Sequence, residues 1–236
     1  MLATENRTQA RQEPKIAVRS TNAIAIWLGE ALRQLLLFPA LRLFVDLKVD
    51  SIDNLTGGGP YIFAANHASH LDTPILLKAL PLRLRLQVRV AAAADYFFTN
   101  RWKGALTSTL LNAFPFERKG IGCTTSLAQA QQLLSKGHSL LIFPEGTRTT
   151  DGRLQPFKRG IGKLAQARSA TIIPTWIEGT FAALPKGSRW PHHPRRHDVV
   201  IRFGTPLSFA PNSNALEITA TVEQQVRALG VQQVFS

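Results

Sequence analysis

A repeated order of apolar runs and helical patterns is the feature that most constrains the fold. Short apolar runs occupy residues 61–65, 139–143 and 170–177, and each ends in a polar loop. Helical patterns occupy residues 73–80, 124–136, 160–168 and 214–229. Because the runs are apolar without strict alternation, they are typical of strands buried on both faces of a parallel sheet. The sequence therefore predicts an α/β fold with a mostly parallel central sheet flanked by helices.

Residues 82–90 differ, because they alternate strictly between aliphatic and polar side chains. This pattern predicts a half-buried strand with Arg83, Arg85 and Arg89 on its outer face. The three guanidinium groups are either a solvated face or a surface for lipid phosphates or an acidic carrier protein. We also expect a helix within residues 97–112, a short strand and basic loop at 112–120, and a strand at 198–203.

The composition limits the class of protein. The 236 residues are enough for one domain with a full-sized core, and the net charge of +13 implies an acidic partner, substrate or membrane surface. Cys123 is the single cysteine, which excludes an internal disulfide framework and fits a reducing compartment. No helix-turn-helix, RNA-recognition or zinc pattern is present, so we expect no nucleic-acid partner. The first 20 residues lack the apolar core of a signal peptide.

The N-terminal part divides into two predicted segments ahead of the main domain, which we expect over residues 48–236. Residues 1–22 are polar and predict a mobile tail. Residues 23–47 predict an amphipathic helix, Pro39 and a second helix, with Glu30, Arg33 and Gln34 as one narrow polar stripe. Sixteen helical residues before Pro39 would reach about 24 Å, too short to span a bilayer. We expect this segment to lie in the membrane interface at the cytoplasmic face, with Trp27 as an anchor; the alternative is a helix packed on the protein's own core.

The stretch from Asn66 to Asp72 places a histidine and a carboxylate where a strand ends and a helix begins. Five residues on an ideal helix turn through about 500°, so only the intervening loop can bring His67 and Asp72 together. This arrangement suits a general base oriented by an acid. The structural alternative is that Asp72 is an ordinary helix N-cap and that His67 satisfies a buried carbonyl.

Two more loops follow predicted strands and carry groups that bind phosphate. One loop lies at Arg118, and the other consists of Glu145, Gly146, Thr147 and Arg148. Ligands of open α/β sheets bind beyond the carboxyl ends of strands, so these loops and His67 should share one edge. A glycine admits a phosphate closely, and arginines bind its oxygens in pairs, with Lys158 adding charge. Glu145 is unsuited to a phosphate pocket and is expected to fix an arginine or a loop amide.

Other reactive side chains predict less. Cys123 and Ser69 are possible nucleophiles, but a buried filler and a turn support are the favoured interpretations. Gly137-His138-Ser139 lacks the last glycine of a nucleophile elbow and enters a strand rather than leaving one. The histidines of residues 192–197 favour a solvated basic loop over a metal site, and we expect no metal.

Taken in order, four blocks resemble the signature of the glycerolipid acyltransferases. They are Asn66-His67-x4-Asp72, Phe116-Glu117-Arg118, Phe143-Pro144-Glu145-Gly146-Thr147-Arg148 and Ile173-Pro174, and the resemblance covers about residues 45–210. It implies a single-domain α/β acyltransferase fold, with His67 and Asp72 as the base pair. It also implies that the second and third blocks hold the glycerol phosphate, that Pro174 belongs to the acyl or substrate pocket, and that Asn66 and Ser69 are substrate-binding residues beside the base.

The resemblance implies transfer of a fatty acyl group from acyl-CoA or acyl carrier protein to the hydroxyl of a lysophospholipid, without a cofactor. The expected acceptor is 1-acylglycerol-3-phosphate, which would give phosphatidic acid by direct attack with His67 as the base. Another lysolipid acceptor, such as a lyso-ornithine lipid, is an alternative with the same chemistry. A basic lipid-binding module is the alternative from another class, but such a module has no use for His67 paired with Asp72.

Overall fold

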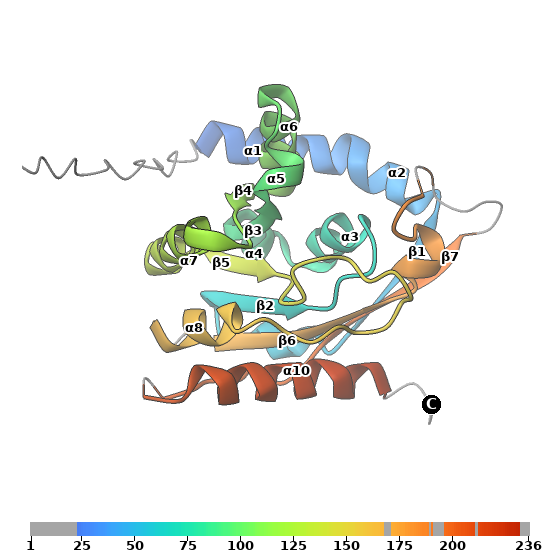
Figure 1. Ribbon diagram of the computed structural model, residues 1–236. Coiled ribbons are helices and arrows are strands. Elements are labelled where there is room, and N and C mark those ends of the chain that lie inside the picture. Colours follow the sequence, from blue (N-terminus) through green and yellow to red (C-terminus); the bar gives the residue numbers. More distant parts are fainter. Residues whose placement is uncertain (1–22, 168–170, 189, 191–195, 211, 232–236) are drawn as a thin grey trace, which may run out of the picture.

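A seven-stranded sheet forms the centre of the protein (Figure 1). The computed structural model describes residues 23–167, 171–188, 190, 196–210 and 212–231. The strands are β1 (Val45–Asp50), β2 (Tyr61–Ala65), β3 (Val88–Ala93), β4 (Ala113–Phe116), β5 (Ser139–Ile142), β6 (Thr171–Glu178) and β7 (His197–Phe203). Their order is β1-β7-β6-β2-β5-β3-β4, and the β6–β7 pairing is antiparallel while the others are parallel. The prediction of a mostly parallel sheet is confirmed.

Helices cover both faces of this sheet (Figure 1). On the upper side in the figure lie α1 (Ala23–Leu32), α2 (Phe38–Arg42), α3 (Asp72–Ala79), α4 (Leu82–Gln87), α5 (Ala94–Phe97) and α6 (Arg101–Leu111). Helices α7 (Gly120–Ser135), α8 (Gly160–Ala167) and α10 (Ala215–Val231) form the other layer, and the short helices η2 (Ile52–Leu55) and α9 (Thr180–Ala183) lie in connections. Apart from their ends, the predicted helices at 73–80, 97–112, 124–136, 160–168 and 214–229 are confirmed.

The central strand β2 explains why its sequence is apolar without alternation. Tyr61 and Phe63 pack into the core below α3, whereas Ile62 and Ala64 pack into a second core with α7, α8 and α10. All five residues of β2 are buried. A strand covered on both faces needs apolar side chains at every position, and its carboxyl end is therefore held rigidly between two packed layers.

The prediction of a strand over residues 82–90 is wrong in its first part. Helix α4 occupies Leu82–Gln87, and β3 begins at Val88. Arg85 is 7% exposed; its side chain donates to the carbonyl oxygens of Leu77 and Leu80 near the end of α3 and is paired with Glu30. Arg89 is 4% exposed, so two of the three arginines are core residues rather than a solvated or phosphate-binding face. The last carbonyls of α3 need hydrogen-bond donors from elsewhere in the fold, and the alternation of residues 82–90 does not show that Arg85 supplies them.

The N-terminal helix does not break at Pro39. Helix α1 continues through a π-helical turn, η1 (Arg33–Leu37), into α2. The N–H of Phe38 bonds to the carbonyl of Arg33, so the helix is wider just before Pro39, which has no N–H to donate. The continuous helix is 20 residues long and is, among the described residues, the one segment long and apolar enough to cross a membrane. The prediction that the helix ends after sixteen residues, before Pro39, is therefore wrong.

Two residues of the predicted polar stripe of this helix face the protein, whereas the third, Gln34, is exposed. Glu30 and Arg33 are 4% and 0% exposed, and they bond to each other at 2.9 Å. Arg33 also donates to the carbonyl of Leu110 at the end of α6, 3.0 Å away. Leu35 and Leu36 on the outer side are 73% and 63% exposed. The helix is amphipathic as predicted, with its apolar side turned away from the rest of the protein.

The predicted boundary at residue 47 can be compared with the structure, whereas the predicted tail at 1–22 cannot. Residue 47, the expected end of the membrane segment, lies inside β1, which runs from Val45 to Asp50 and pairs with β7 in the sheet. The chain therefore enters the central sheet a few residues before the expected domain start at 48. The predicted tail at 1–22 and the ends of the helix at 160–168 and of the strand at 170–177 fall partly or wholly outside the described residues.

Candidate active site

His67 and Asp72 meet at the carboxyl end of β2. The ring nitrogen Nδ1 of His67 lies 2.7 Å from Oδ2 of Asp72. The same oxygen accepts the backbone N–H groups of Ala68 and Ser69 at 2.7 and 2.8 Å. A carboxylate oxygen only accepts hydrogen bonds, so the proton of a neutral imidazole paired with it belongs on Nδ1. Nε2 is then the basic nitrogen of His67.

The alternative interpretation of Asp72 as an N-cap is not what the structure shows. Leu71 occupies the N-cap position of α3, and Asp72 is its first helical residue, with a fully buried side chain. The His67 side chain keeps 19% of its surface exposed, and its ring stacks on Phe143 with 3.9 Å between centroids. The buried acid and the stacked ring fix the orientation of an imidazole that still reaches open space.

That open space is a cavity of about 630 Å³ lined by His67 and His70. Its wall includes apolar side chains, with Ala92, Leu127 and Leu164 among them. It also includes five cationic side chains. The cationic side chains that line it are Lys103, Arg118, Arg148, Lys158 and Lys186, and none of the described lining residues is acidic. The cavity therefore combines an apolar wall with a field that favours an anion beside the base.

Sheet order explains why distant segments converge on this cavity. Strands β2, β5, β3 and β4 are neighbours and parallel, so their carboxyl ends meet at one edge. His67 follows β2, Arg148 follows β5, Tyr96 follows β3 and Arg118 follows β4. The predicted convergence of three loops on one edge is confirmed, and the segment after β3 is a fourth contributor.

Glu145 holds two of these loops together. Its Oε1 accepts the N–H of His67 at 2.5 Å, and its Oε2 accepts the N–H of Gln155 at 2.8 Å. The residue is 3% exposed, and burial raises its pKa to about 7 although both N–H groups act in the opposite direction. Thr149 donates its N–H to the carbonyl of His67 at 2.9 Å. The expectation that Glu145 fixes a loop amide agrees with this geometry; it does not line the cavity.

Arg118 and Lys158 lie on either side of Gly146. Arg118 donates through NH1 to the carbonyl of Gly146 at 2.8 Å. Its NH2 donates to both carboxylate oxygens of Asp95, each at 2.7 Å. Gly146 has φ +72°, and a Cβ there would lie 2.5 Å from Nζ of Lys158. A side chain at this position would both be strained and push the lysine away, so glycine is required. Asp95, which partly neutralises Arg118, was not predicted, because nothing in its local sequence marks it.

Among the cations that line the cavity, Arg148 has a buried nitrogen without a hydrogen-bond partner in the described part of the chain. Its NH1 is buried without a partner among the described residues. Burial lowers the pKa of Arg148, and Tyr96 and Asp72 partly oppose this change. A buried guanidinium with a free N–H gains most from a bound anion. Burial, together with the charges of Arg148 and His67, also lowers the pKa of His70 to about 4, so His70 is neutral at pH 7.

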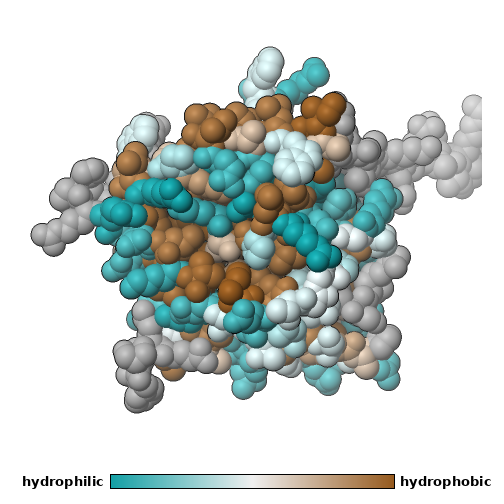
Figure 2. Space-filling view, turned by 180° about the vertical axis from the view of Figure 1, so that it is seen from behind, coloured by the Kyte–Doolittle hydropathy of each residue, from teal (hydrophilic) through white to brown (hydrophobic). Residues whose placement is uncertain are grey.

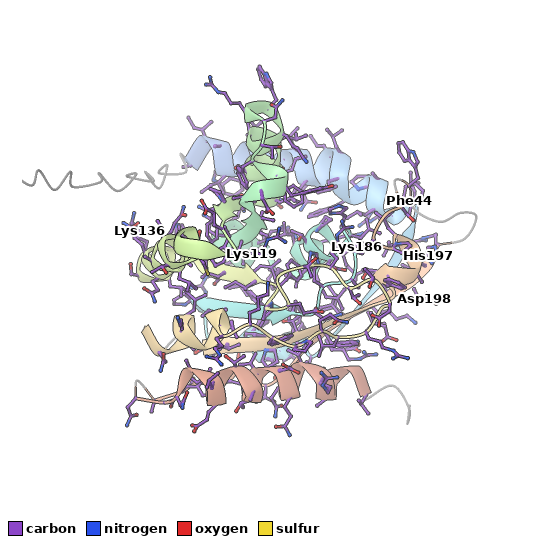
Figure 3. All side chains as sticks on the ribbon, in the orientation of Figure 1. Phe44, Lys119, Lys136, Lys186, His197 and Asp198 are labelled. Carbon is purple, nitrogen blue, oxygen red and sulfur yellow. The ribbon has the colours of Figure 1, made fainter. Side chains whose placement is uncertain are left out.

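Lys186 is a cavity residue that the sequence did not predict. It comes from the segment between α9 and β7 and is labelled in Figure 3. Its Nζ donates to the carbonyl of Arg148 at 3.2 Å and lies 3.4 Å from Oγ1 of Thr147. No motif surrounds it, and only the three-dimensional course of the chain brings it to this loop. Lys103, on the exposed side of α6, is a second such residue.

Besides Glu145, three more predicted site residues lie away from the cavity surface. Asn66 is 6% exposed, and its amide exchanges two hydrogen bonds with the backbone of Ile177 in β6, at 2.7 and 2.8 Å. Ser69 is fully buried and donates to the carbonyl of Leu184 at 2.7 Å. Pro174 pairs with Ala64 inside the sheet. These residues support the loop and the strand behind the base, and they do not touch the space where a substrate would lie.

Cys123 lines the apolar part of the cavity. It also packs against the core formed with α7 and α8, which agrees with its interpretation as a small filler. The structure describes no group of three or more histidine, cysteine or acidic side chains placed to hold a metal within its described residues. Histidines 192 and 193 of the basic loop fall outside those residues.

Comparisons with known proteins identify the family of the chain. A family model described as Acyltransferase matches residues 46–178. The chain is 29% identical over 150 residues to "1-acyl-sn-glycerol-3-phosphate acyltransferase LPAT1, chloroplastic" from Arabidopsis thaliana, covering 61% of this chain and 39% of that protein. It is 32% identical over 165 residues to "1-acyl-sn-glycerol-3-phosphate acyltransferase alpha" from Mus musculus, covering 68% of this chain and 54% of that protein. It is 30% identical over 145 residues to "1-acyl-sn-glycerol-3-phosphate acyltransferase" from Bacillus subtilis, covering 59% of this chain and 68% of that protein.

The fold also has a solved counterpart. The crystal structure of the 1-acyl-sn-glycerophosphate (LPA) acyltransferase PlsC from Thermotoga maritima superposes with a TM-score of 0.65 at 24% identity. It covers 90% of this chain, and the match covers 79% of that chain. The family model spans more than half of the chain and includes the loops that carry His67, Arg118 and Arg148. The chain therefore belongs to the acyltransferase family, among the glycerolipid acyltransferases.

Proposed function

We propose that the protein transfers a fatty acyl group from a thioester donor to the free hydroxyl of 1-acylglycerol-3-phosphate, giving phosphatidic acid. The observation that carries this proposal is the cavity that joins an oriented imidazole to an apolar wall and five cations. A lysophosphatidate has a matching distribution of groups: a hydroxyl to deprotonate, a hydrocarbon chain and a phosphate. The matched relatives are named for this acceptor, although the chain spans less than two thirds of the Arabidopsis and mouse proteins.

His67 acts as the general base in the proposed reaction. Nε2 takes the proton from the acceptor hydroxyl while Asp72 holds the Nδ1 proton and stabilises the imidazolium that forms. The resulting alkoxide attacks the carbonyl carbon of the thioester. The tetrahedral intermediate then expels the thiolate, which can take back the proton from the imidazolium. A thioester is already an activated acyl group, so this route uses no further cofactor.

The cations of the cavity bind the acceptor phosphate. Arg148 is best placed for this role because its NH1 is unpartnered, whereas Arg118 is already paired with Asp95. Lys158 and Lys186 flank the same loop and add charge. Holding both substrates in one cavity supplies much of the rate by proximity.

The main test is an acceptor panel. The purified protein is incubated with lysophosphatidate, other lysophospholipids and a lyso-ornithine lipid, each with acyl-CoA or acyl carrier protein as the donor, and products are identified by mass spectrometry. The expected product is phosphatidic acid. Acylation of a phosphate-free lysolipid at an equal rate would contradict the assignment of the acceptor. Absence of transfer to every acceptor, with lipid binding retained, would favour a binding module.

We further propose that the protein binds the cytoplasmic face of a membrane through the helix at 23–42. The support is the direction of its apolar side: Leu35 and Leu36 are exposed, while Glu30 and Arg33 are held in the protein. A helix docked by its polar stripe lies along the domain, which favours the interface over a perpendicular span. Phe38 and Leu41 belong to the core, so deleting the helix would also damage the fold.

A point substitution tests this attachment more cleanly than a deletion. Leu35→Glu changes a side chain that is 73% exposed, so folding should be unaffected. Binding to anionic vesicles should fall, since a charge in the interface opposes insertion. Sedimentation with vesicles measures the effect. Unchanged binding of Leu35→Glu would show that the exposed side of the helix serves another purpose.

A further inference from the structure

Helix α6 exposes a second apolar face. Trp102 is 85% and Leu106 is 59% exposed, and their spacing of four residues puts them on one side of the helix. Asn100 caps the helix by accepting the N–H of Trp102 at 2.8 Å. Gly104 and Thr107, on the other side, are buried. The helix is therefore fixed at its start and packed along one face, while two large apolar side chains point away from the core.

This face is continuous with the exposed side of α1. A Cβ on Gly29 of α1 would lie only 2.3 Å from the carbonyl oxygen of Thr109 in α6, so the two helices touch backbone to backbone. Arg33 donates to the next carbonyl, that of Leu110. In Figure 1 both helices lie at the top of the molecule, and Figure 2 shows hydrophobic surface gathered along that edge. The two helices form one rigid outer surface.

The same helix reaches the cavity. Lys103, next to Trp102, lines the cavity together with Tyr96 and Phe97 of α5. Nζ of Lys103 donates to the carbonyl of Tyr96 at 2.7 Å and lies 4.0 Å from the centre of its ring. The Tyr96 hydroxyl is 3.4 Å from Nε2 of His70. Tyr96 and Lys103 are exposed and also line the cavity, so they form part of its mouth, as do Thr147, Lys158 and Lys186.

Building on the function proposed above, we propose that α6 is a second contact with an anionic lipid bilayer and that it holds the mouth of the cavity against the lipid. Trp102 and Leu106 insert at the level of the head groups, where a tryptophan is most stable. Arg101, which is exposed beside Trp102, meets lipid phosphates, as the net charge of +13 also favours. A lysolipid then enters past Tyr96 and Lys103 directly from the bilayer, and its acyl chain does not cross water.

The test compares Leu106→Glu and Trp102→Ala with a matched control, Leu216→Glu. Leu216 is 47% exposed at the start of α10, on the opposite side of the sheet. Binding is measured by sedimentation with vesicles of phosphatidylcholine and phosphatidylglycerol at 3:1. The two α6 variants should bind about tenfold more weakly than the parent protein, and Leu216→Glu should bind normally. Circular dichroism melts should match, because all three side chains are largely exposed.

Kinetics separate this contact from a general loss of activity. With a short-chain acceptor below its micellar concentration, both α6 variants should keep the parent kcat and KM. With a long-chain acceptor in vesicles, their KM should rise by about tenfold. Vesicle binding equal to that of Leu216→Glu, or a loss confined to binding of acyl carrier protein, would overturn the lipid contact. Weaker vesicle binding without acyl transfer to any acceptor would support the contact and overturn only the proposed function.

Discussion

Replacing Asp72 by asparagine tests the central pair most directly. The carboxylate lies 2.7 Å from Nδ1 of His67 and is completely buried. Asparagine has nearly the same shape, and its oxygen can still accept the N–H groups of Ala68 and Ser69. What it removes is the negative charge beside the imidazolium. Two unit charges about 4 Å apart interact by about 4 kcal/mol at an effective dielectric constant of about 20.

That energy sets the expected loss. At 1.36 kcal/mol per factor of ten, the Asp72→Asn protein should have a kcat lower by about 10³, within a range of about 10² to 10⁴. Initial rates of thiol release from acyl-CoA with lysophosphatidate measure it. His67→Ala should abolish transfer while donor binding and the melting temperature stay near those of the parent. The pH–rate profile of the parent should show one group that must be deprotonated, absent in His67→Ala.

His70 provides the control within the same loop. Its ring stacks on Tyr96 rather than pairing with Asp72, so His70→Ala should keep substantial activity. A folded Asp72→Asn protein with more than a third of the parent kcat would refute the role of charge. Loss of activity in His70→Ala with an active His67→Ala would show that the wrong histidine has been assigned.

Two further predictions follow from the cavity and its supports. Arg148→Ala should raise the acceptor KM and lower kcat/KM by about 2 kcal/mol, or about thirtyfold, with little change in the donor KM; an equal loss on a phosphate-free acceptor would make Arg148 structural. For Glu145, the pKa of about 7 in the folded protein against its ordinary 4.5 means that the folded protein keeps a proton that the unfolded chain releases. The stability from this group is therefore full below pH 4.5 and lost as pH rises through 7, by at most about 3 kcal/mol, so the melting temperature of Glu145→Gln should depend less on pH in that window.

Sequence patterns predicted the elements whose environment is uniform along their length. The strand at Tyr61–Ala65 is apolar throughout because both of its faces are covered, and this is visible in five residues. The alternation at 82–90 gave a wrong prediction because Arg85 is buried by two contacts that the local pattern does not show. It donates to the carbonyl of Leu80 at the end of α3, and it pairs with Glu30 of α1. The helix at 23–42 was divided at Pro39 because a proline removes one N–H, whereas a π-helical turn absorbs the defect.

The site was predicted where the residues follow strands, and it was missed where they come from elsewhere. His67, Arg118 and Arg148 follow strands that are neighbours in the sheet, so the expectation of a common edge was sufficient to group them. Lys103 and Lys186 come from a helix side and from an irregular segment, where the sequence gives no period or motif to interpret. Asn66 and Ser69 lie within the motif block but support it from behind, so membership of a motif does not decide whether a residue faces the cavity.

Buried charges connect the N-terminal helix to the helix that begins at Asp72. Glu30 of α1 is paired with Arg33 and Arg85. Arg85 also donates hydrogen bonds to the carbonyls of Leu77 and Leu80 at the end of α3. The first residue of the same helix α3 is Asp72. An apolar contact would let α1 slide, whereas a buried ion pair is satisfied in one position and is costly to break. The N-terminal helix is thus held in a fixed register with the helix that begins at Asp72, and in the proposed membrane-bound arrangement this would keep His67 at a fixed distance from the lipid surface.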